Sequence, residues 1–191
     1  GGVPEVLQLS SDPTTILEEF ADHPRQVERP VTLIGFQRQG NLGVGYLAST
    51  LNMFGYSVDV VEFEQPFADI LDIVRRTDPI IVGFSLIFQF HVRRFEQLAR
   101  YLRQNGVAAH FTMGGHFPSL SPGETLRLVP ELDSVVQYEG ELTLLDLVDK
   151  LSTGQAMRTV AGLVLRDADR VVFTAPRSLL PDLDVLPHPH R

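Results

Sequence analysis

Residues 80–115 decide the fold, and they read IIVGFSLIFQFHVRRFEQLARYLRQNGVAAHFTMGG. The stretch opens on an apolar run, passes through a segment whose apolar residues recur every three or four positions, and returns to an apolar run that ends in two glycines. Uninterrupted apolar runs are typical of buried parallel strands, and the three-to-four spacing is typical of an amphipathic helix. The stretch therefore predicts a strand at 80–86, a helix that ends before Asn105-Gly106, and a strand at 108–113.

The same strand–helix unit recurs on both sides of this stretch. Further strands are predicted at 31–36, 58–63 and 133–138. Further helices are predicted from about Asn41 to Gly55, from Phe67 to Asp78-Pro79, from Ser121 to Val129, and through 144–151 to Gly154. Ser121-Pro122-Gly123-Glu124 reads as a capping box with proline at the first helical position. Strict alternation favours an α/β fold, and we expect a doubly wound, five-stranded parallel sheet in the flavodoxin-like (Rossmann-type) order.

The segments outside this repeat are shorter. A helix is predicted at 12–22, and a β-hairpin is predicted from runs at 160–165 and 171–174. The expected division of the chain is an N-terminal helical appendage, a ligand-binding α/β domain, a β-hairpin extension and a proline-rich linker, at 1–30, 31–155, 156–175 and 176–191.

Composition excludes several classes of function. The 191 residues carry 16 basic and 24 acidic side chains, a net charge of −8, which argues against nucleic acid or an anionic membrane surface as the main partner. No apolar run approaches the roughly 20 residues of a membrane helix, and we expect a cytoplasmic protein. The absence of cysteine excludes disulfides, thiolate nucleophiles and iron–sulfur ligation by this chain. Any demanding chemistry therefore needs a bound cofactor.

Ligands of open α/β sheets bind beyond the carboxyl ends of the strands, which singles out the loops at 37–43, 85–91, 114–121 and 138–142. The first loop lacks the lysine of a P-loop and the spacing G-x-G-x-x-G, so it disfavours common nucleotide motifs. Ser85 places a hydroxyl at the end of a central strand, without the G-x-S-x-G turn of a hydrolase. Gly114-Gly115 makes room for a flat or extended group. Each feature alone is also explained by tight packing or by a serine that bonds its own backbone.

Taken together, the features resemble the cobalamin-binding domains of methionine synthases and mutases. Those domains carry Asp-x-His-x-x-Gly, then Ser-x-Leu, then Gly-Gly; this chain has Arg38-x-Gly40-x-x-Gly43, Ser85-Leu86-Ile87 and Gly114-Gly115. The intervals are similar to those of the family, with 41 residues at 44–84 and 26 at 88–113. The position of the family's cobalt-ligating histidine falls on Gly40. The resemblance therefore implies cobalamin bound base-off, without a histidine ligand from the protein.

The chain resembles more closely the N-terminal cobalamin domains of radical S-adenosylmethionine enzymes. The matching stretches are Asn41-Leu42-Gly43 with Leu47-Ala48, Val82 to Ser85, Gly114 to Pro118, Tyr138 to Leu142, and Ala161-Gly162-Leu163 leading to Leu186-Pro187. This resemblance implies a parent enzyme, of the methyltransferase type, in which a radical barrel domain follows on the C-terminal side. That barrel would bind S-adenosylmethionine and a [4Fe-4S] cluster, neither of which this fragment binds.

The resemblance also implies which residues contact the cofactor. Ser85 would bond a ring nitrogen of the nucleotide tail, and Gly114 and Gly115 would clear space for it. No catalytic or metal-binding residue is predicted; His110 is expected to be structural, and Glu139 and Glu141 are explained equally well by the dipole of the following helix. The full set of predicted cofactor-binding residues is Gln39, Gly40, Asn41, Leu42, Gly43, Ser85, Leu86, Ile87, Gly114, Gly115, His116, Tyr138, Glu139 and Gly140.

Two other functions fit a flavodoxin-like fold. A free-standing flavin or nucleotide binder is permitted by the glycines and stays open. A phosphoacceptor receiver domain needs acidic residues after the first strand, an aspartate after the third and a lysine after the fifth. This chain has Phe36-Gln37, Ser85 and Glu139 at those positions, which disfavours a receiver domain.

Overall fold

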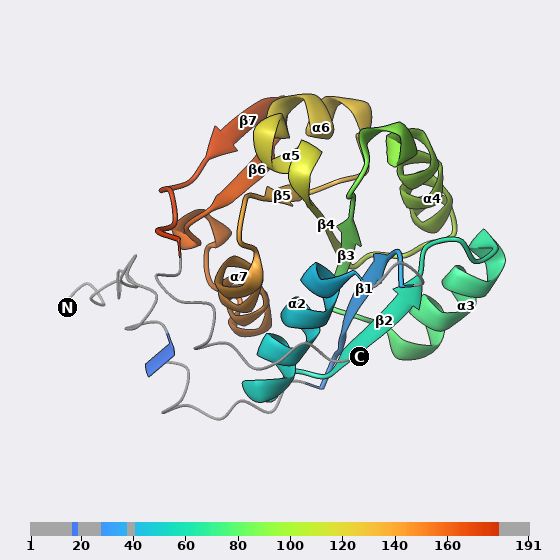
Figure 1. Cartoon of the computed structure of the whole chain (residues 1–191), viewed down its shortest axis with the longest axis horizontal. Coiled ribbons are helices and arrows are strands. Elements are labelled where there is room, and N and C mark those ends of the chain that lie inside the picture. The colour runs from blue at the N-terminus through green and yellow to red at the C-terminus, as the bar shows by residue number, and fades with distance from the viewer. Residues whose placement is uncertain (1–16, 19–27, 38–40, 180–191) are drawn as a thin grey trace.

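A seven-stranded sheet forms the centre of the molecule (Figure 1), as seen in a computed structural model that describes residues 17–18, 28–37 and 41–179. Its order is β2-β1-β3-β4-β5-β6-β7, and the first five strands run parallel. The α/β class and the flavodoxin-like order of these five strands are thereby confirmed. The strands are β1 Val31–Gly35, β2 Val58–Glu62, β3 Ile81–Ser85, β4 His110–Gly114, β5 Ser134–Val136, β6 Leu163–Asp167 and β7 Arg170–Phe173.

The predicted count of five strands is wrong, because the C-terminal hairpin belongs to the sheet. Strand β6 pairs antiparallel with β5, with Val136 opposite Leu163, and β7 pairs with β6. The edge of β5 would otherwise present unpaired backbone groups, and the hairpin covers that edge. The hairpin itself lies where the sequence predicted it, with Ala168 at a φ of +51° in its turn.

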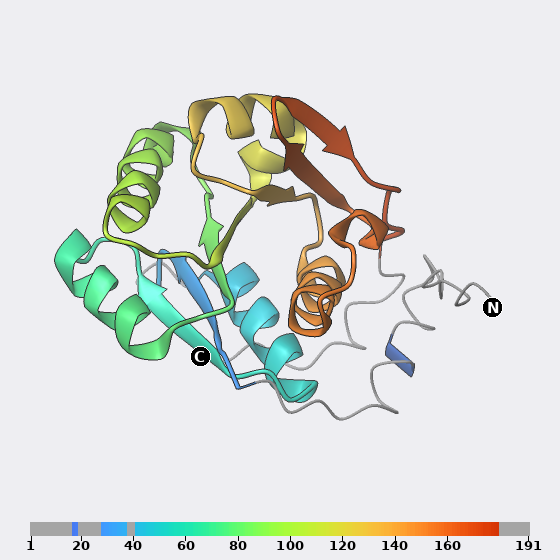
Figure 2. The ribbon, with the colours of Figure 1, turned by 180° about the vertical axis from the view of Figure 1, so that it is seen from behind.

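Helices cover both faces of the sheet (Figures 1 and 2). One face packs against α2 Leu42–Met53 and α7 Glu141–Thr153, which share a core with Val31, Leu33 and Val136. The opposite face packs against α3 Phe67–Thr77, α4 Val92–Gln104 and α6 Pro122–Leu128. The remaining helical pieces are α5 His116–Leu120 and the 3₁₀ turns η1 Gln89–His91 and η2 Met157–Thr159. The side chains that alternate along each strand thus feed two separate apolar layers.

The region after β4 departs from the prediction in two ways. Helix α5 was not predicted, and the capping box at Ser121 is wrong. Ser121 ends α5, since its N–H donates to Phe117 O at 2.9 Å, and its side chain makes no capping bond to α6. Glu124 pairs with Arg127 and does not reach back to the cap. Proline does occupy the first turn of α6, as predicted.

The two terminal predictions fall largely outside the described residues. Of the predicted helix at 12–22, the structure describes Leu17 and Glu18, which are helical. Of the predicted linker at 176–191, it describes residues 176–179. No helix in the described part of the chain combines the length and the apolar character that crossing a membrane requires.

Candidate functional site

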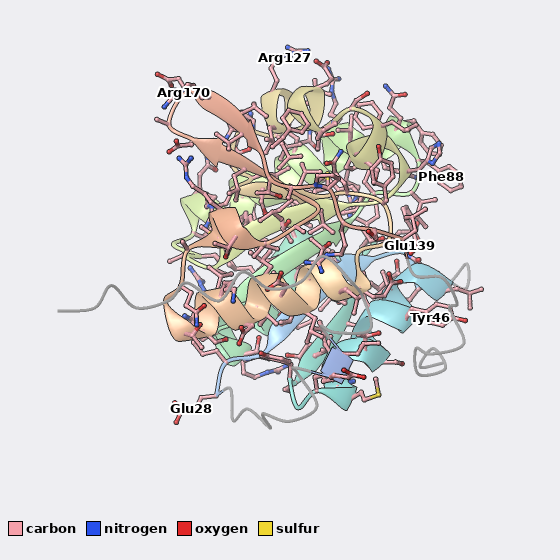
Figure 3. The ribbon with its side chains drawn as sticks, turned by 90° about the vertical axis from the view of Figure 1, so that its left-hand side faces the viewer. Glu28, Tyr46, Phe88, Arg127, Glu139 and Arg170 are labelled. Carbon is pink, nitrogen blue, oxygen red and sulfur yellow. The ribbon has the colours of Figure 1, made fainter. Side chains whose placement is uncertain are left out.

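A slot of about 400 Å³ opens at the carboxyl edge of the sheet and runs between the sheet and the α2–α7 layer. Figure 3 shows this edge from the side: Tyr46, Phe88 and Glu139 lie along it, and Glu28, which precedes β1, lies at the opposite edge. The residues that line the slot are Leu33, Gly43, Val44, Leu47, Gly83, Phe84, Ser85, Thr112, Gly114, Gly115, Val136, Tyr138, Glu139, Gly140, Glu141 and Leu144.

The start of α2 is tied to the end of β3 at the mouth of the slot. Asn41 is the N-cap of α2, and its side-chain oxygen accepts the N–H of Val44 at 3.3 Å. The same side chain donates from Nδ2 to Ser85 Oγ at 3.4 Å. One residue therefore satisfies a free helix N–H and positions the Ser85 hydroxyl at the rim.

The paired glycines have different roles. Gly115 has a φ of +120°, and a Cβ there would lie 2.1 Å from the carbonyl oxygen of Leu86. Only glycine fits this close approach of two backbones. Gly114 accepts the N–H of Leu86 at 2.9 Å, and a Cβ on it would reach no closer than 3.5 Å to Val136 O. Gly115 is thus required by the backbone, whereas Gly114 leaves the slot wall open.

The loop after β5 closes the third side of the mouth. Tyr138 has a φ of +55°, and its N–H donates to Ser119 Oγ at 2.7 Å. Ser119 in turn donates to Gly115 O at 2.7 Å, so α5 links this loop to the paired glycines. A Cβ on Gly140 would lie 3.1 Å from Val136 Cγ1, which shows how closely the loop packs on β5.

Glu141 supplies a buried carboxyl group to the slot wall. It lies in the first turn of α7, and its Oε2 is buried without a hydrogen-bond partner. Burial raises the pKa of this carboxyl, and the nearby charge of Glu139 raises it further. No arginine or lysine is among the lining residues. The slot therefore suits a largely uncharged group that brings N–H or O–H donors to an acceptor that lacks one.

Half of the predicted site residues line the slot. Asn41 lies at the mouth of the slot. Leu42 and His116 are exposed and do not line the slot, and Ile87 also lies outside it. Leu86 packs in the core on the opposite face of the sheet. Gln39 and Gly40 fall outside the described residues. The predicted residues that line the slot are Gly43, Ser85, Gly114, Gly115, Tyr138, Glu139 and Gly140.

Sequence reasoning missed the floor of the slot, which is formed by Leu33, Gly83, Thr112 and Val136. A usable signal existed, since residues two apart on a strand share a face. Gly83 precedes Ser85 by two residues, and Thr112 precedes Gly114 by two. The lining residues Val44, Leu47 and Leu144 were predicted only to lie on the apolar faces of their helices. Glu141 was explained only by its interaction with the dipole of the following helix.

His110 does not line the slot. Its ring lies at the amino end of β4, with Nε2 at 2.8 Å from Ser134 Oγ. Among the residues that the structure describes, no group of three or more histidines and carboxylates is arranged to hold a metal ion.

Comparison with known proteins gives one family and several relatives. The model of the B12 binding domain matches residues 37–148. PH0819, an uncharacterised methyltransferase of Pyrococcus horikoshii, is 31% identical over 153 residues, which cover 78% of this chain and 32% of that protein. The cytidylyl-2-hydroxyethylphosphonate methyltransferase of Streptomyces wedmorensis is 28% identical over 158 residues, which cover 71% of this chain and 29% of that protein. This chain thus spans about a third of the length of these relatives.

Solved structures share the fold. The radical S-adenosylmethionine methyltransferase TsrM from Kitasatospora setae, with cobalamin and a [4Fe-4S] cluster bound, has a TM-score of 0.68 at 18% identity, over 86% of this chain and 32% of that one. The cobalamin-dependent S-adenosylmethionine radical enzyme OxsB, with aqua-cobalamin and S-adenosylmethionine bound, has a TM-score of 0.67 at 19% identity, over 91% of this chain and 28% of that one. At these identities the likeness shows a common fold.

Proposed function

We propose, because this chain belongs to the B12-binding domain family, that its slot holds the nucleotide tail of a cobalamin to which the protein supplies no histidine ligand. One observation carries the proposal. A slot at the carboxyl edge of the sheet is walled by Ser85, the paired glycines and the unpartnered Glu141 Oε2. That is the edge at which open α/β sheets bind their ligands.

The described residues fit such a tail. Ser85, positioned by Asn41, offers a hydroxyl to a polar atom of the tail, and Gly114 leaves the wall open beside it. Glu141 Oε2 accepts an amide N–H or a sugar hydroxyl, either of which relieves an unsatisfied buried oxygen. Cobalamin, when bound, supplies a cobalt centre that accepts and donates methyl groups.

The absence of a histidine ligand is part of the proposal. In the sequence, the position that corresponds to the family's ligating histidine holds Gly40. None of the residues that line the described slot is a histidine. His91, at the end of η1, packs against the ring of Phe36 at a centroid distance of 4.7 Å. We therefore expect base-off cobalamin held by its tail and edges.

We infer that the parent protein is a radical S-adenosylmethionine enzyme of the methyltransferase type. The methyltransferase relatives and the shared fold of TsrM and OxsB support this inference. A barrel domain on the C-terminal side would carry S-adenosylmethionine and the [4Fe-4S] cluster. Location in the cytoplasm stays a prediction from the sequence.

The test is retention of hydroxocobalamin. We expect the purified chain, incubated with hydroxocobalamin and desalted, to keep the corrin absorbance in its visible spectrum. Ser85→Leu should abolish retention, because a larger apolar side chain would fill the mouth. Ser57→Leu is the matched control; this exposed serine lies before β2, at the opposite edge of the sheet, and its replacement should leave retention unchanged.

Two results would contradict the proposal. A wild-type chain that retains no corrin would overturn it, provided that circular dichroism shows the chain to be folded. Retention of flavin mononucleotide in place of hydroxocobalamin in a parallel incubation would favour the alternative of a flavin-binding module.

A further inference from the structure

Three polar side chains interrupt the apolar layer under α2 and α7. His110 and Thr112 on β4 and Ser134 on β5 all face this layer, where strand neighbours such as Ile81 and Val136 are apolar. Thr112 is 3% exposed, Ser134 is fully buried, and the side chain of His110 is 7% exposed. Buried polar groups are costly unless they are hydrogen-bonded, so their partners matter.

The three side chains form one hydrogen-bonded chain. His110 Nε2 lies 2.8 Å from Ser134 Oγ, and Ser134 Oγ donates to Thr112 Oγ1 at 2.8 Å. Thr112 Oγ1 donates to the carbonyl oxygen of Ser134 at 3.3 Å, which is longer than the usual O–H···O distance of about 2.5–3.0 Å. The hydroxyl hydrogen of Thr112 is therefore weakly held and free to be redirected.

The hydrogen bonds among His110, Ser134 and Thr112 can be arranged in more than one way. Burial lowers the pKa of His110, which favours a neutral ring that both donates and accepts. The two hydroxyls can rotate, so the direction of the hydrogen bonds can reverse. Thr112 can thus act as a donor or as an acceptor toward a group in the slot.

Thr112 lies at the deep end of the slot. It pairs with Gly83, whereas Ser85 pairs with Gly114 at the mouth, so Thr112 lies two residues deeper. At about 3.3 Å per residue this depth is roughly 7 Å. The other residues that form the floor are apolar or lack a side chain: Leu33, Gly83 and Val136. Thr112 is therefore the one polar side chain among these floor residues.

We propose that Thr112 makes the slot selective for cobamides whose lower base is a purine. This inference rests on the proposed function, since it concerns the buried base of the tail. The dimethylbenzimidazole of cobalamin ends in a benzene edge with methyl groups, which has no donor or acceptor for a hydrogen bond with a hydroxyl. Adenine has ring nitrogens and an amino group at the corresponding edge, and these match a hydroxyl that either donates or accepts. One additional hydrogen bond corresponds to roughly a fivefold gain in affinity.

The experiment compares two cobamides on the same chain. We would titrate the wild type with hydroxocobalamin and with the adenine-containing cobamide in its hydroxo form, and measure both dissociation constants by absorbance. The wild type should bind the adenine form about fivefold more tightly. Thr112→Val, which keeps the shape and removes the hydroxyl, should bring the ratio close to one, and Thr112→Ser should keep the preference.

Thr32→Val is the matched control. Thr32 is also fully buried and its Oγ1 has no hydrogen-bond partner, but it lies on β1 and shares the opposite face with Ile34. Its replacement should leave the ratio of the two affinities unchanged. The ratio of the two dissociation constants is the informative quantity. If Thr112 merely joined β4 to β5, its replacement would weaken the binding of both cobamides equally.

Ser134→Ala gives a second test that does not alter the lining of the slot. Ser134 stands behind Thr112 as a positioning residue, and its loss should reduce the preference without removing it. Equal affinities in the wild type, or a preference that survives in Thr112→Val, would overturn the inference while leaving the proposed function intact. Failure of the folded wild type to bind either cobamide would remove the proposed function and the inference together.

Discussion

A single residue, Glu141, makes the stability of the folded protein depend on pH. Burial raises the pKa of its carboxyl above the ordinary value of about 4.5, so the folded state favours the neutral form. The stability that comes from this neutral carboxyl is fully present below the unfolded pKa and is lost as the pH rises through the folded pKa. The wild type should therefore become less stable as the pH rises from about 4.5 to the folded pKa of this carboxyl.

Glu141→Gln should remove this loss, because glutamine resembles the neutral acid. We expect the variant to be more stable than the wild type at pH 8 and to show no advantage at pH 4. Urea unfolding at the two pH values measures the difference. Glu124→Gln is a control of opposite sign, since Arg127 lowers the pKa of that exposed carboxyl, and it should bring no gain at pH 8. Equal behaviour of Glu141→Gln at both pH values would contradict the assignment.

Residues at the mouth of the slot were predictable because their sequence signals are local. Gly114-Gly115 and Ser85 stand directly after apolar runs, at the ends of predicted strands. Thr112 was not predicted, although its position two residues before Gly114 indicates a shared face of the strand; what the sequence does not show is its place beside Gly83 and its bond to Ser134, 22 residues away. Such pairing between strands leaves no mark on the nearby sequence.

At the scale of elements, a buried ion pair joins the segment after β7 to helix α7. Arg177 Nη2 lies 2.8 Å from Asp146 Oδ2, and Arg177 Nε donates to Thr143 Oγ1 at 2.9 Å and to Ala161 O at 3.2 Å. The two charged side chains are only 6% and 2% exposed. This attachment fixes the direction in which the chain leaves the hairpin.

Arg177→Met should cost about 3–5 kcal/mol in the free energy of unfolding, because it leaves the charge of Asp146 buried. Denaturant unfolding measures the change. Arg158→Met is the matched control: Arg158 pairs with Asp167, but both side chains are largely exposed, and its loss should cost less than about 1 kcal/mol. If the two variants lost equal stability, burial would not explain the Arg177 pair. Arg177→Met combined with Asp146→Leu should recover much of the loss.

The elements themselves were predictable to different degrees. The parallel strands and the long helices followed from apolar runs and from three-to-four spacing, which are properties of each segment alone. Helix α5 was missed because it is five residues long, follows two glycines and contains Pro118. The capping box failed because Ser121 already serves as the end of α5. The hairpin was found, but its pairing with β5 is a tertiary contact that its own sequence does not specify.

At the scale of the whole molecule, the slot belongs mainly to one of the two helical layers. Helices α2 and α7 supply Gly43, Val44, Leu47, Glu141 and Leu144 to its walls, whereas α3, α4 and α6 supply none of the lining residues. A ligand in the slot therefore restrains the first turns of α2 and α7 directly. Its effect on the opposite layer, α3, α4 and α6, comes only from stabilising the folded molecule as a whole.

Hydrogen exchange can separate these two effects. Ligand at a hundred times its dissociation constant stabilises the folded state by about 2.7 kcal/mol, which slows every amide that exchanges through global unfolding. Amides that exchange through local opening respond only where the ligand restrains them. With hydroxocobalamin bound, the first turns of α2 and α7 should therefore gain protection beyond the global effect, whereas the first turns of α3 and α4 should not. Equal protection of both layers would contradict a slot ligand, and Ser85→Leu should show no change in either layer.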